Sequence, residues 1–230
     1  MQKTAGEFWG ELAVEYDDII RRLVSPYPAM VWALLNYLPE GFVPKRILEF
    51  GCGTGNLTAV LRRRWPDSAI VVVDAAESML AKTKERIGEL GLELVNSRFE
   101  DLAFGSNEFD YITSSLSLHH LSQEQFQILL RKSHSWLKPG GFFGLLDCVR
   151  AESDRLYKRA ENHWIDLAKK HGLSDKEMAE QIAHHKAHDH YPILIDLPQW
   201  FRESAYEEVD ILWRYCIWAV LQARKPVKVG

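Results

Sequence analysis

The sequence predicts an α/β domain built on a doubly wound, mostly parallel β-sheet. Apolar, strand-like runs alternate with helix-like segments over residues 45–149, which is the spacing of βαβ units. The run at residues 69–74, AIVVVD, is rich in β-branched residues, and this composition indicates a strand buried on both faces, as in a parallel sheet. At 230 residues with 47% apolar side chains, the chain is long enough for one such domain with a substantial core.

The expected elements follow one another along the chain. Residues 8–38 are expected to form helices with a break at Ser25-Pro26, because proline ends or interrupts a helix. We expect strands at residues 45–51, 69–74, 92–99, 109–121 (running into a turn) and 142–149, and helices at 56–65, 78–90 and 124–137, the last ended by the sequence KPGG.

After Val149 the regular alternation stops, and residues 151–190 look wholly helical. Within them, Ser174 and Glu177 have the spacing of a capping box. A short helix is expected to begin at Asp196, and residues 208–225 resemble a hairpin, which brings the sheet to seven strands. We therefore expect a single domain over residues 1–230, made of an N-terminal helical cap (1–40), a core (41–150), a helical insertion after the fifth strand (151–195) and a closing helix with its hairpin (196–230).

Charge and cysteine content narrow the function classes. The formal net charge is −4, so we do not expect nucleic-acid binding through phosphate neutralisation. The three cysteines lie far apart without a CxxC pair, which argues against a disulfide framework or a zinc ribbon. No stretch approaches the roughly 18 apolar residues that cross a bilayer, and the first residues lack a signal-peptide pattern. We expect a cytoplasmic protein that does not enter a membrane.

The sequence EFGCGTGN, residues 49–56, follows an expected strand and opens an expected helix. Glycine is needed in such a turn so that backbone can turn sharply and approach a ligand closely. A glycine-rich turn alone is weak, because dinucleotide-binding enzymes have a related G-x-G-x-x-G. Here the pattern is G-x-G-x-G, and Asp74 ends the following strand. A carboxylate at that position can accept hydrogen bonds from both hydroxyls of a ribose.

In this order and spacing the chain resembles the class I S-adenosylmethionine (SAM) methyltransferases, which have a Rossmann-like fold. Five blocks carry the resemblance over about residues 40–150: EFGCGTGN, VVVDAAESML, RFEDLAF, FDYITSSLSLHHL and LKPGG. The resemblance implies SAM as the cofactor, bound by the core at residues 41–150. The implied cofactor-binding residues are Tyr16, Glu49, Gly51, Cys52, Gly53, Thr54, Asn56, Asp74, Ala75, Met79, Phe99, Glu100 and Ser115.

The resemblance also implies particular roles for these residues. The turn glycines would line the methionine part of SAM, Asp74 would hold the ribose, and Tyr16 would close over the cofactor. Ala75 and Met79 would flank one side of the adenine, Phe99 would cover the other, and the Ser115 carbonyl would accept from its amino group. Met79 and Phe99 would look the same if they were core residues.

One position departs from the family pattern. The family usually has an acidic residue just before the position of Phe99, where it accepts a hydrogen bond from the adenine amino group. This chain has Arg98 there, and a guanidinium cannot accept. Either Glu100 or Asp101 substitutes for that residue, or only backbone contacts the adenine.

The sequence SLSLHHL after the fourth strand indicates the acceptor side. The chain lacks the [DN]-P-P-[YF] block of amino-group methyltransferases, and SLSLHHL is the form of many small-molecule enzymes of the class. A hydroxyl, thiol or acidic-carbon acceptor can need a base, and histidine is the usual one near neutral pH. His119 and His120 lie in this sequence. Each could instead be a packing or turn-stabilising residue.

The sequence HHKAHDH, residues 184–190, holds four of the nine histidines. His184 and His188 share one helix face, the spacing of two-histidine metal sites. A third ligand, His190 or Asp189, would be in reach only if the helix ended early, so we expect no metal. A solvated helix end is the simpler alternative. We prefer a third interpretation, in which the insertion folds over the strand ends and closes a small-molecule pocket as a lid.

In that interpretation His188 and His190 approach His119, and we predict these three as the catalytic residues of a SAM-dependent methyltransferase. Two alternatives remain open. The second half is loosely similar to carboxy-SAM synthase, which modifies SAM itself, although the carboxylate-binding arginine of that enzyme does not carry over clearly to AHHKAHDHYP. The protein could also be a SAM-binding regulator without catalytic activity, a view that Arg98 favours.

Overall fold

The computed structural model describes residues 16–227, so the expected helix before residue 16 lies outside the described part of the chain. The strands are β1 (Arg46–Phe50), β2 (Ala69–Asp74), β3 (Leu92–Asn96), β4 (Phe109–Ser115), β5 (Leu137–Cys148), β6 (Glu207–Tyr215) and β7 (Trp218–Arg224). The helices are α2 (Tyr16–Leu23), α3 (Tyr27–Asn36), α4 (Asn56–Arg64), α5 (Glu77–Ile87), α6 (Gln123–Trp136), α7 (Asp154–Lys170), α8 (Asp175–His188) and α9 (Leu197–Glu203), with short 3-10 turns η1 (Phe99–Asp101) and η2 (Leu118–His120).

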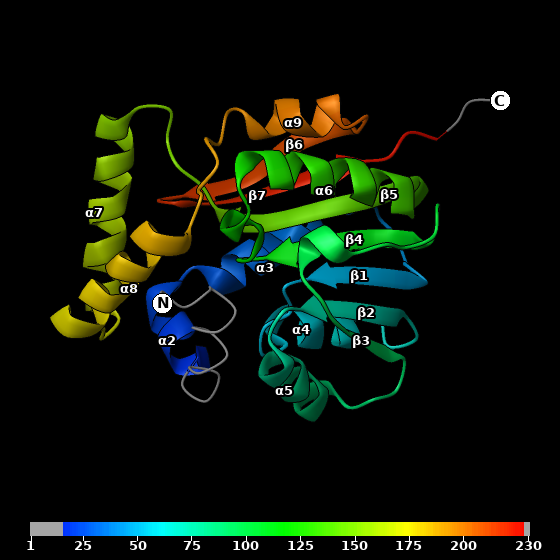
Figure 1. The fold of residues 1–230 in the computed structure, drawn as a ribbon, viewed down its shortest axis with the longest axis horizontal. Helices are drawn as coiled ribbons and strands as arrows, with labels where there is room; N and C mark the ends of the chain where they lie inside the picture. Colours follow the sequence, from blue (N-terminus) through cyan, green and yellow to red (C-terminus); the bar gives the residue numbers. More distant parts are fainter. Residues whose placement is uncertain (1–15, 228–230) are drawn as a thin grey trace.

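The strands form one seven-stranded sheet in the order β3-β2-β1-β4-β5-β7-β6 (Figure 1). The five strands β1 to β5 run parallel, whereas β7 pairs antiparallel with both β5 and β6. The chain leaves β1 through β2 to β3 at one edge and then returns to add β4 beside β1. This reversal places a topological switch point between β1 and β4, where α/β proteins bind ligands. The predicted doubly wound, mostly parallel sheet is confirmed.

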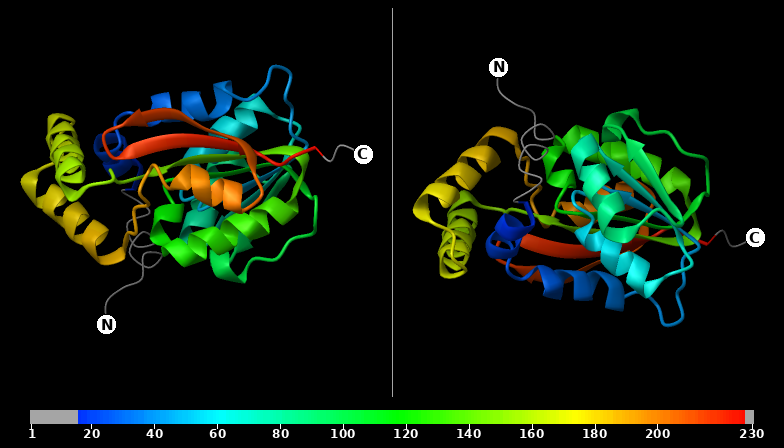
Figure 2. Two further views of the ribbon diagram at one scale, coloured as in Figure 1. Left: turned by 90° about the horizontal axis from the view of Figure 1, so that it is seen from above. Right: turned by 90° about the horizontal axis from the view of Figure 1, so that it is seen from below.

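Alternating side chains of the strands build two cores, one on each face of the sheet. Ile47 of β1 packs with α3, α4 and α5 on one face, while its neighbours Leu48 and Phe50 pack with α6 and α9 on the other. Figure 2 shows these two helical layers enclosing the sheet. Because both faces are covered, the middle of β2 is buried throughout, as its β-branched composition predicted.

The helical insertion follows β5 and lies beside the carboxyl ends of the parallel strands (Figure 1). Helix α7 contacts both α8 and the N-terminal helix α2. Two polar contacts hold this arrangement: the Trp164 indole donates to the Leu23 carbonyl at 3.2 Å, and Arg22 pairs with Glu177 at 3.0 Å. The insertion and α2 therefore stand together over the strand ends, where the sequence predicts the ligand site.

Several element boundaries differ from the prediction. The third strand ends at Asn96 rather than residue 99, and the fifth begins at Leu137 rather than residue 142. The KPGG sequence therefore belongs to β5, since Leu137 already pairs with Phe109 of β4 and the register shift that follows absorbs the glycines. The insertion is not wholly helical over 151–190 either.

Helix α8 does begin with the expected capping box, in which the Ser174 hydroxyl accepts from the Glu177 amide and the Glu177 carboxylate accepts from the Ser174 amide. It ends at His188, and Asp189 is extended (φ −102°, ψ 141°). This early end turns Asp189 towards the strand ends. Within residues 16–227, no helix is both long and apolar enough to span a membrane.

Candidate active site

The glycine-rich turn between β1 and α4 needs glycine for two physical reasons. Gly51, Gly53 and Gly55 all have positive φ angles, at 62°, 54° and 80°. A Cβ atom at Gly51 would lie 1.8 Å from the Ser117 hydroxyl oxygen, and one at Gly55 would lie 2.9 Å from that of Thr83. A side chain is therefore disfavoured at these glycines, and the turn's backbone at Gly51 and Gly53 lines a cavity of about 870 Å³.

Asp74, at the end of β2, lies beside this turn. Its two carboxylate oxygens accept hydrogen bonds from the backbone amides of Gly53 and Ala76, each at 2.9 Å. Burial raises the pKa of Asp74 and these amides lower it, with a net rise. The amides fix the orientation of the carboxylate and leave it further acceptor capacity on the side of the cavity. That is the arrangement a ribose diol requires.

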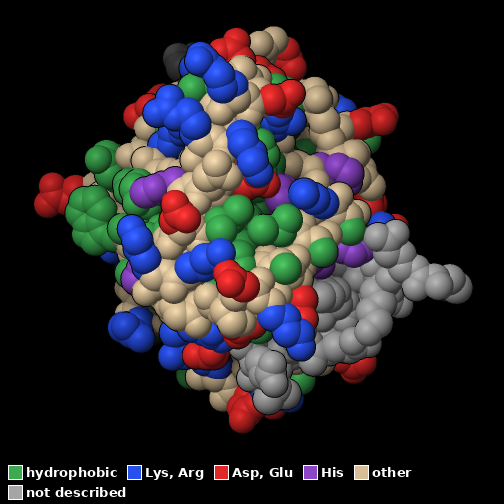
Figure 3. Space-filling model, turned by 90° about the vertical axis from the view of Figure 1, so that its left-hand side faces the viewer, with side chains coloured by type: hydrophobic (Ala, Val, Ile, Leu, Met, Phe, Trp, Pro, Cys, Tyr) green, Lys and Arg blue, Asp and Glu red, His purple; other side chains and the backbone are tan. Residues whose placement is uncertain are grey.

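The cavity holds about 870 Å³ and extends from Asp74 to the histidines of η2 and α8. Figure 3 views the molecule from the side of α7 and α8, where apolar side chains gather at the centre with histidines around them. Seven of the predicted cofactor-binding residues line the cavity: Gly51, Gly53, Asp74, Ala75, Met79, Phe99 and Glu100.

The other predicted cofactor residues lie elsewhere around the turn. Glu49, Cys52, Asn56 and Ser115 line a separate, much smaller cavity, which Gly51 also lines. Thr54 lines neither of these two cavities. It is buried, and its hydroxyl donates to Asp17 of α2 at 2.6 Å. Tyr16 begins α2, but its side chain lies outside the described residues.

Glu100 is one of the two acidic residues that the sequence offers to accept a hydrogen bond from the adenine amino group. Arg98 pairs with the Glu100 carboxylate at 3.0 Å, and the Gln125 amide donates to the same oxygen at 2.9 Å. Partial burial raises the pKa of Glu100, but hydrogen bonds, above all from Arg98, and the positive charges of Arg98 and Lys132 together outweigh burial and lower it. Glu100 thus lines the cavity beside Phe99 as a carboxylate that can accept, whereas Asp101 is exposed and does not line it.

At the opposite end of the cavity, His119 of η2 is held by Asp147 of β5. The His119 Nδ1 atom lies 2.5 Å from Asp147 Oδ1, and Asp147 Oδ2 accepts from the backbone amides of Leu118 and His119 at 2.9 and 3.2 Å. Nδ1 therefore carries a proton and donates it to Asp147, and Nε2 is the ring nitrogen on the opposite side. Burial lowers the pKa of His119, but Asp147 and Asp189 outweigh burial and raise it to about 8.

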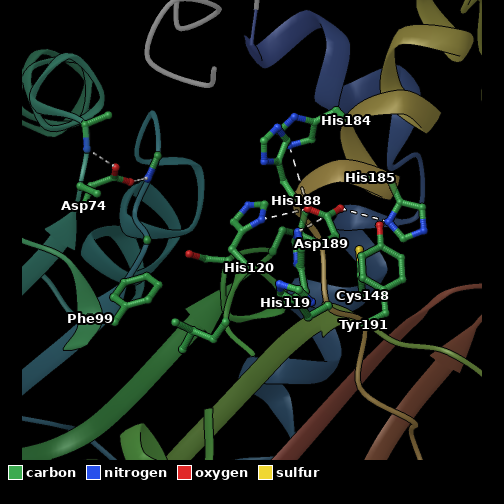
Figure 4. A pocket seen from close by; sticks show the side chains of 18 of the residues that line it. Asp74, Phe99, His119, His120, Cys148, His184, His185, His188, Asp189 and Tyr191 are labelled. Atoms are coloured by element: carbon green, nitrogen blue, oxygen red, sulfur yellow. Dashed lines mark hydrogen bonds and ion pairs between the residues drawn. The ribbon is translucent and has the colours of Figure 1, made fainter. Parts of the chain in front are cut away.

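Asp189, just past the end of α8, is surrounded by histidines (Figure 4). Its carboxylate lies 3.8 Å from His119 Nε2, 2.9 Å from His120 Nδ1 and 3.3 Å from His185 Nδ1. The side chain is 5% exposed. Burial raises the pKa of Asp189, and the surrounding histidines outweigh burial and hold it well below the usual value. Helix α8 thus brings a buried carboxylate against the two histidines of η2.

The insertion also carries the other two residues that the sequence predicted as catalytic. His188 lines the cavity, and its ring lies 4.8 Å from that of His184, centroid to centroid. The His190 amide donates to the His119 carbonyl at 2.6 Å, although its side chain is exposed. The structure therefore brings all three predicted histidines to one end of the cavity. Sequence reasoning assigned no role to Asp147, which lies near the end of the expected strand 142–149.

A parallel α/β sheet with a glycine-rich turn and a strand-end carboxylate on one cavity defines a nucleoside-cofactor-binding protein. Comparisons with known proteins narrow this class. Residues 47–141 match the family model described as a methyltransferase domain. The carboxy-S-adenosyl-L-methionine synthase of Trichodesmium erythraeum is 27% identical over 177 residues, which is 74% of this chain and 69% of that protein.

An uncharacterised methyltransferase of Synechocystis is 33% identical over 138 residues, 60% of each protein. Among solved structures, phosphoethanolamine N-methyltransferase 2 of Haemonchus contortus, in complex with SAM, has a similar fold, with a TM-score of 0.64 and 14% identity over 87% of this chain and 53% of that one. The chain thus spans about half to two thirds of these relatives. Residues 47–141 thus carry a methyltransferase domain, and the chain as a whole is similar to proteins named as SAM-dependent enzymes.

Proposed function

We propose that the protein transfers the methyl group of SAM to a small-molecule acceptor that lies between Asp74 and His119. One observation carries this proposal: a single cavity joins seven of the predicted cofactor residues to the histidine end. Its volume of about 870 Å³ falls in the range of roughly 300–1,000 Å³ for small-ligand sites. The cofactor would fill part of that space and leave room for a compact acceptor.

The residues at the cofactor end fit SAM. The carboxylate of Asp74 is oriented by two backbone amides, and the side-chain-free backbone of Gly51 and Gly53 faces the same space. When bound, SAM supplies an electrophilic methyl group. The protein contributes alignment and exclusion of water, which are the main requirements of an in-line displacement. Apolar residues of α2 and β7, including Leu23 and Trp218, line the cavity and help to exclude water.

At the acceptor end, His119 is the residue best placed to activate the acceptor. Asp147 fixes its ring, and Nε2 lies on the side of Asp189 and the cavity. His188 and His190 stand close by on the insertion, where they would contact the acceptor and close the site as a lid. The two helices of the insertion, α7 and α8, are held to α2, which supports this role.

A carboxy-SAM synthase-like activity is the second candidate, because relatives with that name match most of the chain. Such an enzyme must bind an additional carboxylate. Among the described residues, Arg98 is the only lysine or arginine that lines the cavity, and it is paired with Glu100 at the predicted adenine end. The charge of the cavity therefore favours ordinary methyl transfer. His119 is hydrogen-bonded to Asp147 and thereby oriented, which argues against a SAM-binding regulator without catalytic activity.

The proposal is tested by incubating the protein with isotopically methyl-labelled SAM and a panel of small hydroxyl, thiol, amine and carbon acids. We expect labelled product and S-adenosylhomocysteine by mass spectrometry, and His119→Ala should reduce turnover at least tenfold while the Kd of SAM stays unchanged. Absence of SAM binding at millimolar concentration would overturn both enzymatic functions. A carboxymethyl group on the cofactor would favour the synthase.

A further inference from the structure

Three side chains at the acceptor end of the cavity form a ligand set that the sequence did not assign. The nitrogen and oxygen ligand atoms of His119, His120 and Asp189 all lie within 4.8 Å of one another. Asp189 Oδ2 is 3.8 Å from His119 Nε2, and its Oδ1 is 2.9 Å from His120 Nδ1. Ligands held about 2.1 Å from a tetrahedral ion lie roughly 3.4 Å apart. We propose that these three residues bind a divalent transition-metal ion such as Zn²⁺.

The environment of His119 supports this assignment. A metal-binding histidine usually donates its other ring nitrogen to a carboxylate or a carbonyl, which fixes the ring and raises its basicity. His119 has this partner, because its Nδ1 lies 2.5 Å from Asp147. Asp147 is in turn held by three backbone amides, those of Leu118, His119 and Cys148. The Nε2 atom is thereby presented to the space beside Asp189 in a fixed direction.

The contact between His120 and Asp189 is a second, independent observation. Although His120 Nδ1 and Asp189 Oδ1 lie 2.9 Å apart, they are not aligned as a hydrogen bond, and both are buried atoms without a hydrogen-bond partner. A buried carboxylate oxygen without such a partner carries a large free-energy cost. Two such atoms, close together but not hydrogen-bonded to each other, are placed so that both can bind one ion. A cation would satisfy both.

The buried negative charges around the site also support a bound cation. Asp147 is 1% exposed and the Asp189 side chain 5%. Throughout residues 16–227, the ion pairs of these two carboxylates are all with histidines, never with lysine or arginine. Two buried negative charges need compensation, and one divalent ion supplies it.

This metal site differs from the one weighed in the sequence, where His184 and His188 of one helix would have formed the pair. Here the two histidines belong to η2, and α8 contributes the carboxylate from just beyond its end. Three protein ligands leave at least one position open, as in catalytic zinc sites. An acceptor hydroxyl oxygen bound there would have a lowered pKa and would release its proton to water before attacking the methyl carbon. This last step rests on the proposed function, whereas metal binding does not.

Metal binding is measured on the untagged full chain after removal of metal with EDTA. We expect isothermal titration to show one Zn²⁺ per chain with a Kd below 10 μM, and an increase in Tm on binding. His120→Ala and Asp189→Asn should each weaken binding at least tenfold. His171→Ala, which removes an exposed histidine at the end of α7, should bind as the wild type does, and circular dichroism verifies that each variant folds.

Two results would overturn the proposal: no stoichiometric binding of Zn²⁺, Mn²⁺, Co²⁺ or Ni²⁺ by the wild-type chain, or equal binding by the wild type and both variants. SAM titration of the same metal-free protein separates this proposal from the proposed function. If SAM binds and methyl transfer proceeds at an unchanged rate without metal, the role of the metal in activating the acceptor is wrong, while the methyltransferase function stands. If SAM does not bind, the proposed function fails whatever the metal result.

Discussion

Replacing Asp74 with asparagine removes the charge at the predicted ribose site while preserving the shape of the side chain. In the structure, both carboxylate oxygens already accept hydrogen bonds from backbone amides at 2.9 Å, and the ribose hydroxyls would add two further hydrogen bonds. A hydrogen bond to a charged group contributes about 1.5–3 kcal/mol. Loss of two such bonds, partly offset by the remaining amide oxygen, weakens binding by about 3 kcal/mol, which is roughly 100-fold in Kd.

Isothermal titration of SAM and S-adenosylhomocysteine against Asp74→Asn measures this effect. The matched control is Asp67→Asn, because Asp67 is an exposed acid in the turn between α4 and β2 and should leave the Kd unchanged. In the variant, the asparagine NH2 faces one of the backbone amides that donates to the carboxylate in the wild type. Because two donors then face each other, the free energy of unfolding should fall by about 1 kcal/mol. A Kd within threefold of the wild type, in a folded variant, would refute the ribose assignment.

Three further predictions follow from the structure. Burial raises the pKa of Glu49 to about 8, from 4.5 in a solvated carboxyl group. The wild type should therefore lose stability relative to Glu49→Gln as pH rises from about 4.5 to about 8, by roughly 1.4 kcal/mol per pH unit, in urea unfolding at successive pH values. Gly51→Ala should lower the unfolding free energy by at least about 2 kcal/mol, whereas Gly41→Ala, with a positive φ but open space around it, should cost about 1 kcal/mol. His188→Ala and His190→Ala should each lower turnover severalfold with the Kd of SAM kept.

Each of these has a clear contrary result. A stability difference between wild type and Glu49→Gln that does not vary with pH would mean that Glu49 has the same pKa in the folded and unfolded chain, so that burial does not raise it. Equal losses for Gly51→Ala and Gly41→Ala would show that the contact with Ser117 relaxes easily. Unchanged turnover in both histidine variants would reject their contact with the acceptor.

The sheet could be predicted because its signal is local and repeated. The run AIVVVD and the alternation of apolar runs with helical segments depend only on neighbouring residues. The boundaries of β3 and β5 could not, because they depend on partners far away in the chain. Leu137 continues the strand through pairing with Phe109, although KPGG by itself favours a turn.

The candidate site also has a part that the sequence predicts and a part that it does not. The glycine-rich turn and Asp74 form a compact motif with a fixed spacing, so their shared position could be predicted. The partnership of His119 with Asp147 joins residues on neighbouring strand ends, β4 and β5, which sequence order alone does not pair. Asp189 faces His120 only because α8 ends at His188. A helix end is uncertain by a residue or two from sequence, and one more turn of helix would have carried Asp189 elsewhere.

The central claim is that one cavity holds SAM at Asp74 and presents its methyl group to the His119 end. A crystal structure with S-adenosylhomocysteine tests it most directly. The account predicts the ribose hydroxyls within hydrogen-bonding distance of Asp74, the adenine between Met79 and Phe99, and the sulfur directed towards His119. A nucleoside bound outside this cavity, or a sulfur directed away from the histidines, would contradict it.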